Sequence, residues 1–219
     1  MRSSKYFIAI RILLVLLFAV SAVFYPQLPD RLASHWNAAG EADGYSSKFW
    51  GLFMLPLIAT VLALLLILIP RLDPLKTNIE KFKGSYYQFI VAFLIFFLYI
   101  QALTIVFNLG YTFNMTLVLM PAFAILFYFV GTMVGKAKRN YFIGIRTPWT
   151  LASDTVWDKT HALGAKLFKI AAGISLIGIL FGQYAVWFML VSVLIAAITT
   201  IIYSYIIFQR EGKPRAASQ

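Results

Sequence analysis

Apolar residues along this chain are gathered in long runs, and polar residues are gathered in the segments between them. A helix that crosses a bilayer needs about 20 consecutive apolar residues, and six runs reach or approach that length. The runs cover residues 6–25, 49–69, 87–107, 115–135, 167–184 and 185–208. The pattern therefore predicts an all-α integral membrane protein, built as a six-helix transmembrane bundle.

The polar segments divide this predicted bundle into four parts. The parts are residues 1–69 (two helices with a structured outer loop at 26–48), 70–114 (a basic inner loop and the third helix), 115–208 (helices four to six with an inner loop at 136–166) and 209–219 (a tail). The first run is predicted to be a retained helix rather than a signal peptide, because it is long enough to span and lacks a small-residue cleavage site.

Basic residues are distributed unevenly between the two sides of the predicted bundle. If the N-terminus lies inside, all of the 19 lysine and arginine residues except Arg31 and Lys48 fall on the inner side. Cytoplasmic segments of membrane proteins carry such an excess of basic residues. Both termini are therefore predicted to be cytoplasmic, with the loop at 26–48 outside.

The outer loop is longer and more patterned than a simple connection. Turn-forming residues at 37–40 and 43–44 flank short segments, which predicts a small hairpin-like cap. His35, Trp36 and Asn37 lie in this loop and are candidate contacts for an extracellular ligand. An ordered interfacial lid without a ligand is the competing interpretation.

The inner loops are predicted to contain short helices at the membrane surface. One lies in the basic loop at 70–86. In the loop at 136–166, Thr147 and Pro148 form a helix start, because threonine can cap a helix and proline at its first position loses no needed donor. A second start at Ser153 predicts a short amphipathic helix that continues into the next membrane helix.

The inner loop at 136–166 also holds residues that a plain connection does not need. Arginine and tryptophan are frequent interface anchors, because they bury a large area and keep a polar group available. The candidate partner-binding residues are Asn140, Gly144, Arg146, Thr147, Pro148, Trp149, Trp157 and His161. Two other interpretations stay open: the motif folds the loop against the bundle, or phospholipid headgroups neutralise its basic residues.

Composition excludes several classes of protein. With 61% hydrophobic and 12% charged residues, the chain is not an ordinary soluble protein. It has no cysteine, so disulfides, thiolate metal sites and cysteine nucleophiles are absent. The net charge of +11 would indicate nucleic-acid binding in a soluble protein, but membrane topology accounts for the basic residues here. We expect membrane lipids around the chain and no direct contact with nucleic acid.

The titratable residues of the two long loops predict no metal, no cofactor and no catalytic residue. His35, Glu41 and Asp43 share one loop, but their spacing matches no metal site. Asp158 and His161 are three residues apart on a predicted helix, yet no serine nucleophile or second histidine accompanies them. We therefore do not expect an enzyme.

The predicted bilayer interior is almost uncharged. Arg11 and Lys169 are the charged residues of the apolar runs and lie near a membrane surface, while Gln101 and Ser175 are among the few polar residues near mid-depth. Ion-coupled transporters usually need buried ionisable residues or broken helices at the midplane. A ligand is therefore expected to act at the two surfaces.

Two stretches of the chain resemble a known family. NYFIGIRTPWTL at residues 140–151, followed by W-x-x-x-H at 157–161, resembles the SdpI family of bacterial and archaeal multi-pass membrane proteins. The upstream segment LPDRLASHWNAAGEADGYSSKF at 28–49 resembles the outer-loop domain of unknown function that often precedes it. Together the two stretches cover both of the long loops.

The resemblance implies a membrane immunity protein. The best-known member of the family protects a producing cell from its own secreted killing-factor toxin, senses that toxin, and holds a small transcriptional repressor at the membrane. A peptide toxin outside and a repressor inside are thus the implied partners. Two alternatives stay open: a small-solute or lipid transporter, for which the outline of an inverted three-plus-three repeat is a hint, and a membrane-embedded enzyme.

Overall fold

The computed structural model describes residues 2–211 of the chain, with side chains from Ser4 onward. The long helices are α1 (Arg2–Phe24), α2 (Lys48–Leu72), α4 (Lys83–Asn108), α5 (Met115–Val134), α7 (Asp154–Gly178) and α8 (Ala185–Glu211). The short helices are α3 (Lys76–Glu80), α6 (Pro148–Ala152) and the 3-10 turns η1 (Tyr25–Gln27) and η2 (Ile179–Tyr184). Two strands, β1 (Arg31–Trp36) and β2 (Ala42–Ser47), pair antiparallel.

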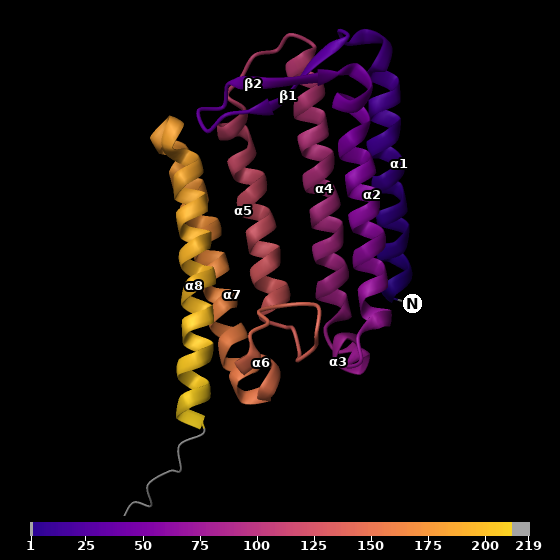
Figure 1. The fold of residues 1–219 in the computed structure, drawn as a ribbon. Coiled ribbons are helices and arrows are strands. Elements are labelled where there is room, and N and C mark those ends of the chain that lie inside the picture. Colours follow the sequence, from indigo (N-terminus) through magenta and orange to yellow (C-terminus); the bar gives the residue numbers. More distant parts are fainter. Residues whose placement is uncertain (1, 212–219) are drawn as a thin grey trace, which may run out of the picture.

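The long helices run side by side, with the two strands across one end and α3 and α6 at the other (Figure 1). Helix α4 packs against α1, α2 and α5, and α7 packs against α5 and α8. We call the end with the strands the hairpin end and the end with α6 the motif end. The first turn of α1 and the last turn of α8 both lie at the motif end (Figure 1).

Five helical segments of the described chain are long and apolar enough to cross a membrane. The last segment spans 58 residues, from Asp154 to Glu211, and contains both α7 and α8. The two helices meet in η2, where Gly182 has a φ of 56° and the chain reverses. The structure is therefore that of a multi-pass helical membrane protein, while six crossings and cytoplasmic termini stay predictions.

The predicted cap is present as a β-hairpin, and its two strands are the only ones in the part of the chain that the structure describes. Its turn lies at residues 37–40, where the Gly40 N–H donates to the Asn37 carbonyl at 2.9 Å. The predicted turn at 43–44 is wrong, since both residues lie inside β2. Gly44 is needed there for a different reason: a Cβ at this position would come within 2.8 Å of the His35 Cβ.

Helix α7 begins well before the apolar run from which it was predicted. The run begins at residue 167, but the helix begins at Asp154, capped by the Ser153 hydroxyl, which accepts the Val156 N–H at 3.3 Å. The predicted amphipathic helix of the inner loop is therefore the first part of a membrane helix. This continuity fixes the orientation of Trp157 and His161 relative to the bundle.

A proline in the middle of α2 leaves one carbonyl without its helical donor. Pro56 has no N–H to donate to the Leu52 carbonyl. That oxygen accepts instead from the Gln101 side-chain amide of α4 at 2.9 Å and from the Ser21 hydroxyl of α1 at 3.0 Å. Because an unpaired carbonyl is costly in hydrocarbon, this node holds α1, α2 and α4 together.

The second proline of α2 has a similar replacement donor. The apolar run ends at residue 69, before Pro70, but the helix continues to Leu72. Pro70 cannot donate to the Leu66 carbonyl, and the Tyr86 hydroxyl of α4 donates to it at 2.7 Å. The tyrosine supplies the missing hydrogen bond, so the helix can pass the proline.

Coupling between Gln101 and Pro56 follows from the shared Leu52 carbonyl. We expect Gln101→Leu to cost more stability when residue 56 is proline than when it is alanine, because Pro56→Ala restores the missing N–H. A double-mutant cycle measured by unfolding in detergent should give a coupling of about 1 kcal/mol. Ser175→Ala is the control, since the buried Ser175 hydroxyl bonds the Ala171 carbonyl of its own helix at 2.8 Å. Additive effects of Gln101→Leu and Pro56→Ala would contradict this account of the node.

The cysteine-free chain allows a direct test of orientation. Ala38 in the hairpin turn and Ala152 at the end of α6 are both exposed, at opposite ends of the bundle. A single cysteine at position 38 is expected to react with a membrane-impermeant thiol reagent in intact cells, and one at 152 to react after the cells are opened. Reaction at 152 in intact cells would overturn the orientation inferred from charge.

Candidate functional site

The inner-loop motif folds through one buried asparagine. Asn140 is fully buried, and its amide donates to the carbonyls of Lys138 at 2.8 Å and Ile143 at 2.9 Å. Its side-chain oxygen accepts the N–H groups of Phe142 at 3.0 Å and Ile143 at 2.6 Å. The side chain thus satisfies backbone groups that a helix or strand would otherwise satisfy. Asn140 is a structural residue of the motif.

His161 joins this loop to α7. Its Nε2 accepts the Ile145 N–H at 3.0 Å and its Nδ1 donates to the Trp157 carbonyl at 2.8 Å, which assigns a neutral imidazole with its proton on Nδ1. The Trp157 ring stacks on the imidazole, with centroids 3.9 Å apart, and its Nε1 donates to the Ala137 carbonyl at 2.9 Å. Both imidazole nitrogens are used in holding the loop.

Gly144 is required by two features of this contact. Its φ of 112° lies in the region that side chains disfavour, and a Cβ there would overlap the His161 Nε2. The turn can therefore bring the Ile145 N–H onto the imidazole only with glycine at position 144.

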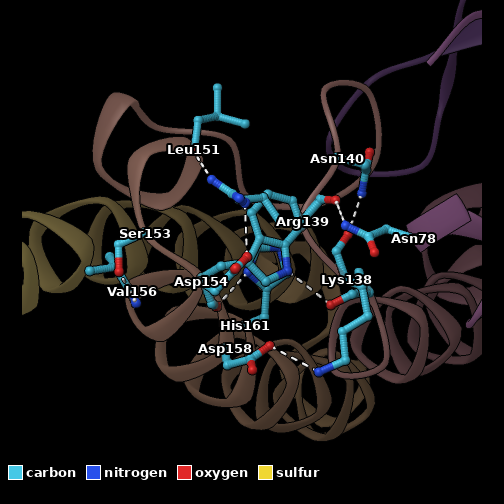
Figure 2. Close-up of polar contacts among 12 residues, drawn as sticks. Asn78, Lys138, Arg139, Asn140, Leu151, Ser153, Asp154, Val156, Asp158 and His161 are labelled. Carbon is cyan, nitrogen blue, oxygen red and sulfur yellow. Dashed lines mark hydrogen bonds and ion pairs between the residues drawn. The ribbon is translucent and has the colours of Figure 1, made fainter. Parts of the chain in front are cut away.

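Ion pairs fasten the loop to the first turns of α7, as Figure 2 shows. Lys138 pairs with Asp158 at 3.1 Å, and the Arg139 Nε lies 2.8 Å from an Asp154 oxygen. The four side chains are between 31% and 73% exposed, so solvent screens both pairs and each contributes little to stability. Their geometry does not support acid–base chemistry, because the ion partner of Asp158 is Lys138 and the Nδ1 of His161 donates to the backbone.

Two residues between α2 and α4, one after the end of α2 and one in α3, belong to the same network, and sequence reasoning missed them. Asp73, only 2% exposed, accepts the N–H of Tyr141 at 2.8 Å and that of Leu75 at 2.7 Å. Asn78 donates from its side chain to the Arg139 carbonyl at 2.9 Å (Figure 2). An aspartate before proline signals a local turn, but no local pattern reveals partners more than 60 residues away.

Thr147 and Trp149 attach α6 to α8. The Thr147 hydroxyl accepts the Thr150 N–H at 3.1 Å, which completes a capping box with Pro148 at the first helical position. The same hydroxyl lies 3.0 Å from that of Ser204, and the Trp149 ring packs edge-on against Tyr205 at 5.1 Å. The predicted helix start is present, and it places α6 on α8.

A hollow of about 490 Å³ lies between this segment and the bundle. Residues 144–149 form one wall, and Phe168 of α7 and Thr200 of α8 belong to the other. Arg146 is exposed at this hollow and donates one hydrogen bond, to the Tyr141 carbonyl at 2.8 Å. Five of the predicted inner residues thus line one hollow, whereas Asn140, Trp157 and His161 are buried behind it.

Asparagine side chains dock the β-hairpin on the helices. Asn108, at the end of α4, accepts the Ala33 N–H at 2.8 Å and donates to the Ala33 carbonyl at 3.0 Å, as a neighbouring strand would. Asn114, which caps α5, donates to the Ala39 carbonyl at 2.6 Å. The hairpin is therefore fixed to α4 and α5.

The three predicted outer residues do not share one role. Asn37 holds the turn, because its side-chain oxygen accepts the Glu41 N–H at 3.1 Å. Trp36 packs edge-on against Phe107 of α4 at 5.4 Å. His35 faces outward, with a side chain that is 72% exposed and an Nδ1 2.5 Å from an Asp43 oxygen. Among residues 2–211, no three histidine or acidic side chains are grouped as a metal site.

The fold and its two polar ends define a multi-pass helical membrane protein with a β-hairpin at one end and a folded motif loop at the other. Residues 136–204 match the SdpI/YfhL protein family, and residues 12–60 match the Domain of unknown function (DUF1648). The resemblance to the SdpI family predicted from the two loops is thereby confirmed.

The chain is also similar to a named protein over most of its length. It is 26% identical over 195 residues to the Immunity protein SdpI of Bacillus subtilis (strain 168), covering 89% of this chain and 91% of that relative. No solved structure matches the chain.

Gly144 offers a test of the motif geometry. Gly144→Ala is expected to lower the free energy of unfolding by about 2 kcal/mol or more, because it adds backbone strain and a clash with His161. Gly173→Ala in α7 is the matched control, since a Cβ at that helical position meets no atom within 4 Å. It should be neutral or slightly stabilising. Equal effects of the two changes on thermal unfolding in detergent would show that the close approach at Gly144 is wrong.

Proposed function

We propose that this protein is an SdpI-type membrane immunity protein, which protects the cell that makes it from an extracellular antimicrobial peptide toxin. The observation that carries the proposal is the extent of the similarity to the Immunity protein SdpI, which covers 91% of that relative. The two family matches also include both ordered ends, the hairpin and the motif loop.

The hairpin end suits contact with a peptide at the membrane surface. Tyr45 on β2 and Phe49 and Trp50 in the first turn of α2 are each at least half exposed. Exposed aromatic side chains of this kind lie at the headgroup level of membranes, where amphipathic peptides also bind. A toxin that approaches along the membrane would meet these aromatic side chains and, on the same hairpin, the exposed His35–Asp43 pair.

A cytoplasmic partner, such as a transcriptional repressor, is the second part of the proposal. The hollow at the motif end combines the Arg146 guanidinium with the Trp149 ring. Arginine and tryptophan are favourable anchors for a partner, since one supplies directed donors and the other a large apolar face. The hollow is therefore the place where we expect the inner partner to bind.

The alternative functions require residues that already have structural partners. A transporter with a midplane site would need polar groups such as Gln101, whose amide nitrogen already donates to the Leu52 carbonyl and lies 2.8 Å from the Ser21 hydroxyl, which leaves only its buried side-chain oxygen without a partner among the described residues. A membrane enzyme would need a proton-transfer group such as His161, whose two nitrogens bind the backbone. These contacts favour the immunity proposal over both alternatives.

A survival assay tests the proposal directly. The full-length chain is expressed in cells that are sensitive to the secreted killing factor because they lack their own immunity protein, and we expect the cells to survive. His35→Ala should abolish most of the protection, since it removes an exposed polar group without removing a packing contact. Arg31→Ala, at an exposed position on the same strand, is the control and should protect as well as the unchanged chain.

Several outcomes would contradict this proposal. Lysis of cells in which the unchanged chain is inserted in the membrane would show that it gives no immunity to this toxin. Equal protection by the His35→Ala chain would remove His35 from the toxin contact. Loss of protection by Arg146→Lys together with full protection by His35→Ala would move the contact to the motif end.

A further inference from the structure

A second hollow at the motif end is lined by basic and aromatic residues. It has a volume of about 340 Å³ and lies where the start of α1, the start of α4 and the end of α5 meet. Its polar lining residues are Tyr6, Lys81, Lys83, Ser85, Tyr87 and Lys136. It is separate from the hollow beside Arg146, with which it shares no lining residue.

The hollow keeps a net positive charge. Lys83 pairs with Glu80, the one carboxylate that the described ion pairs place at this hollow. The Lys81 ammonium donates to the uncharged Asn78 amide oxygen at 2.9 Å, and Lys136 is exposed. Two of the three lysines are therefore left to balance the charge of an anion.

The start of α4 adds backbone donors on the same side. Phe82 precedes this 26-residue helix and provides no side-chain cap. The Ser85 and Tyr86 N–H groups donate to the Phe82 carbonyl, whereas those of Lys83 and Gly84 come before the first helical hydrogen bond. A Cβ on Gly84 would meet no atom within 4 Å, so a ligand can approach this end. Helix N-termini favour anions.

Aromatic rings and apolar side chains indicate that the anion belongs to a lipid. Tyr6 of α1 and Tyr87 of α4 stack with their centroids 6.0 Å apart, and amphipathic rings of this kind lie at the headgroup level. The Phe7 ring of α1 also packs on the Tyr87 ring, with centroids 5.1 Å apart, so apolar surface adjoins the hollow. A molecule with a phosphate in the hollow would thus meet apolar surface for its acyl chains.

We propose that this hollow binds the phosphate headgroup of an anionic membrane lipid. The ammonium groups of Lys81 and Lys136 neutralise the phosphate, and the N-terminus of α4 supplies backbone donors. The site is independent of the proposed immunity function, because none of its lining residues belongs to the hairpin or to the hollow beside Arg146.

Thermal unfolding of the purified full-length protein in a neutral detergent tests the site. Short-chain phosphatidylglycerol should raise the unfolding midpoint, because a ligand that binds the folded state stabilises it. Phosphatidylcholine with the same chains and inorganic phosphate should leave the midpoint almost unchanged. Lys81→Ala combined with Lys136→Ala should weaken phosphatidylglycerol binding roughly thirtyfold, since each lysine near an anionic surface contributes about a factor of five.

The control is a second double variant with the same change in net charge. Lys76→Ala with Lys159→Ala removes two exposed lysines of the motif end that do not line the hollow, and it should bind phosphatidylglycerol as the unchanged protein does. If both double variants bound phosphatidylglycerol equally weakly, general surface charge would account for the loss, and the proposed site would be overturned. A midpoint shift of the same size with inorganic phosphate would overturn the assignment to a lipid.

Discussion

The Leu52 carbonyl lacks its helical donor, and much of the bundle is arranged around the side chains that replace it. Gln101 reaches this oxygen from α4 and Ser21 reaches it from α1, so one missing N–H brings three helices together. Tyr86 repeats the arrangement at the Leu66 carbonyl. Because hydrocarbon offers no water to an unpaired carbonyl, the position of α4 against α2 is strongly specified. Asn108, at the far end of the same α4, then fixes where the hairpin docks.

Hydrogen bonds from side chains to backbone groups also explain how the motif loop keeps its shape. Residues 136–147 contain no regular helix or strand, yet Asn140, His161 and Asp73 hold their backbone groups in place. Side chains used in this way are not free to bind a ligand. The buried part of the motif is therefore a rigid support, and its binding capacity lies in the exposed wall that contains Arg146 and Trp149.

Hydropathy was enough to predict the long helices, since each must cover a bilayer with apolar side chains. Turn chemistry predicted the hairpin at 37–40 and the helix start at Thr147, because these conformations depend on adjacent residues. Capping chemistry predicted the start of α7 at Ser153, whereas hydropathy alone placed the beginning of this helix at residue 167, since its first turns carry charges that pair with the loop and interrupt the apolar run. The role of Asp73 was missed because it depends on a contact distant in sequence. His161 was recognised as a candidate, but the use of both its nitrogens could be learned only from the fold.

The division between buried and exposed motif residues also limits what the family resemblance can explain. Much of the motif, including Asn140, Gly144, Trp157 and His161, serves to fold the loop against α7. A match at these positions indicates the same loop geometry, and two proteins with that geometry can still bind different ligands. In the function that we propose, differences in toxin recognition would then arise from side chains that the fold leaves exposed, such as His35 and Tyr45 on the hairpin. On that proposal the hairpin end would set the specificity, while the motif end would supply the frame and the surface for a second partner.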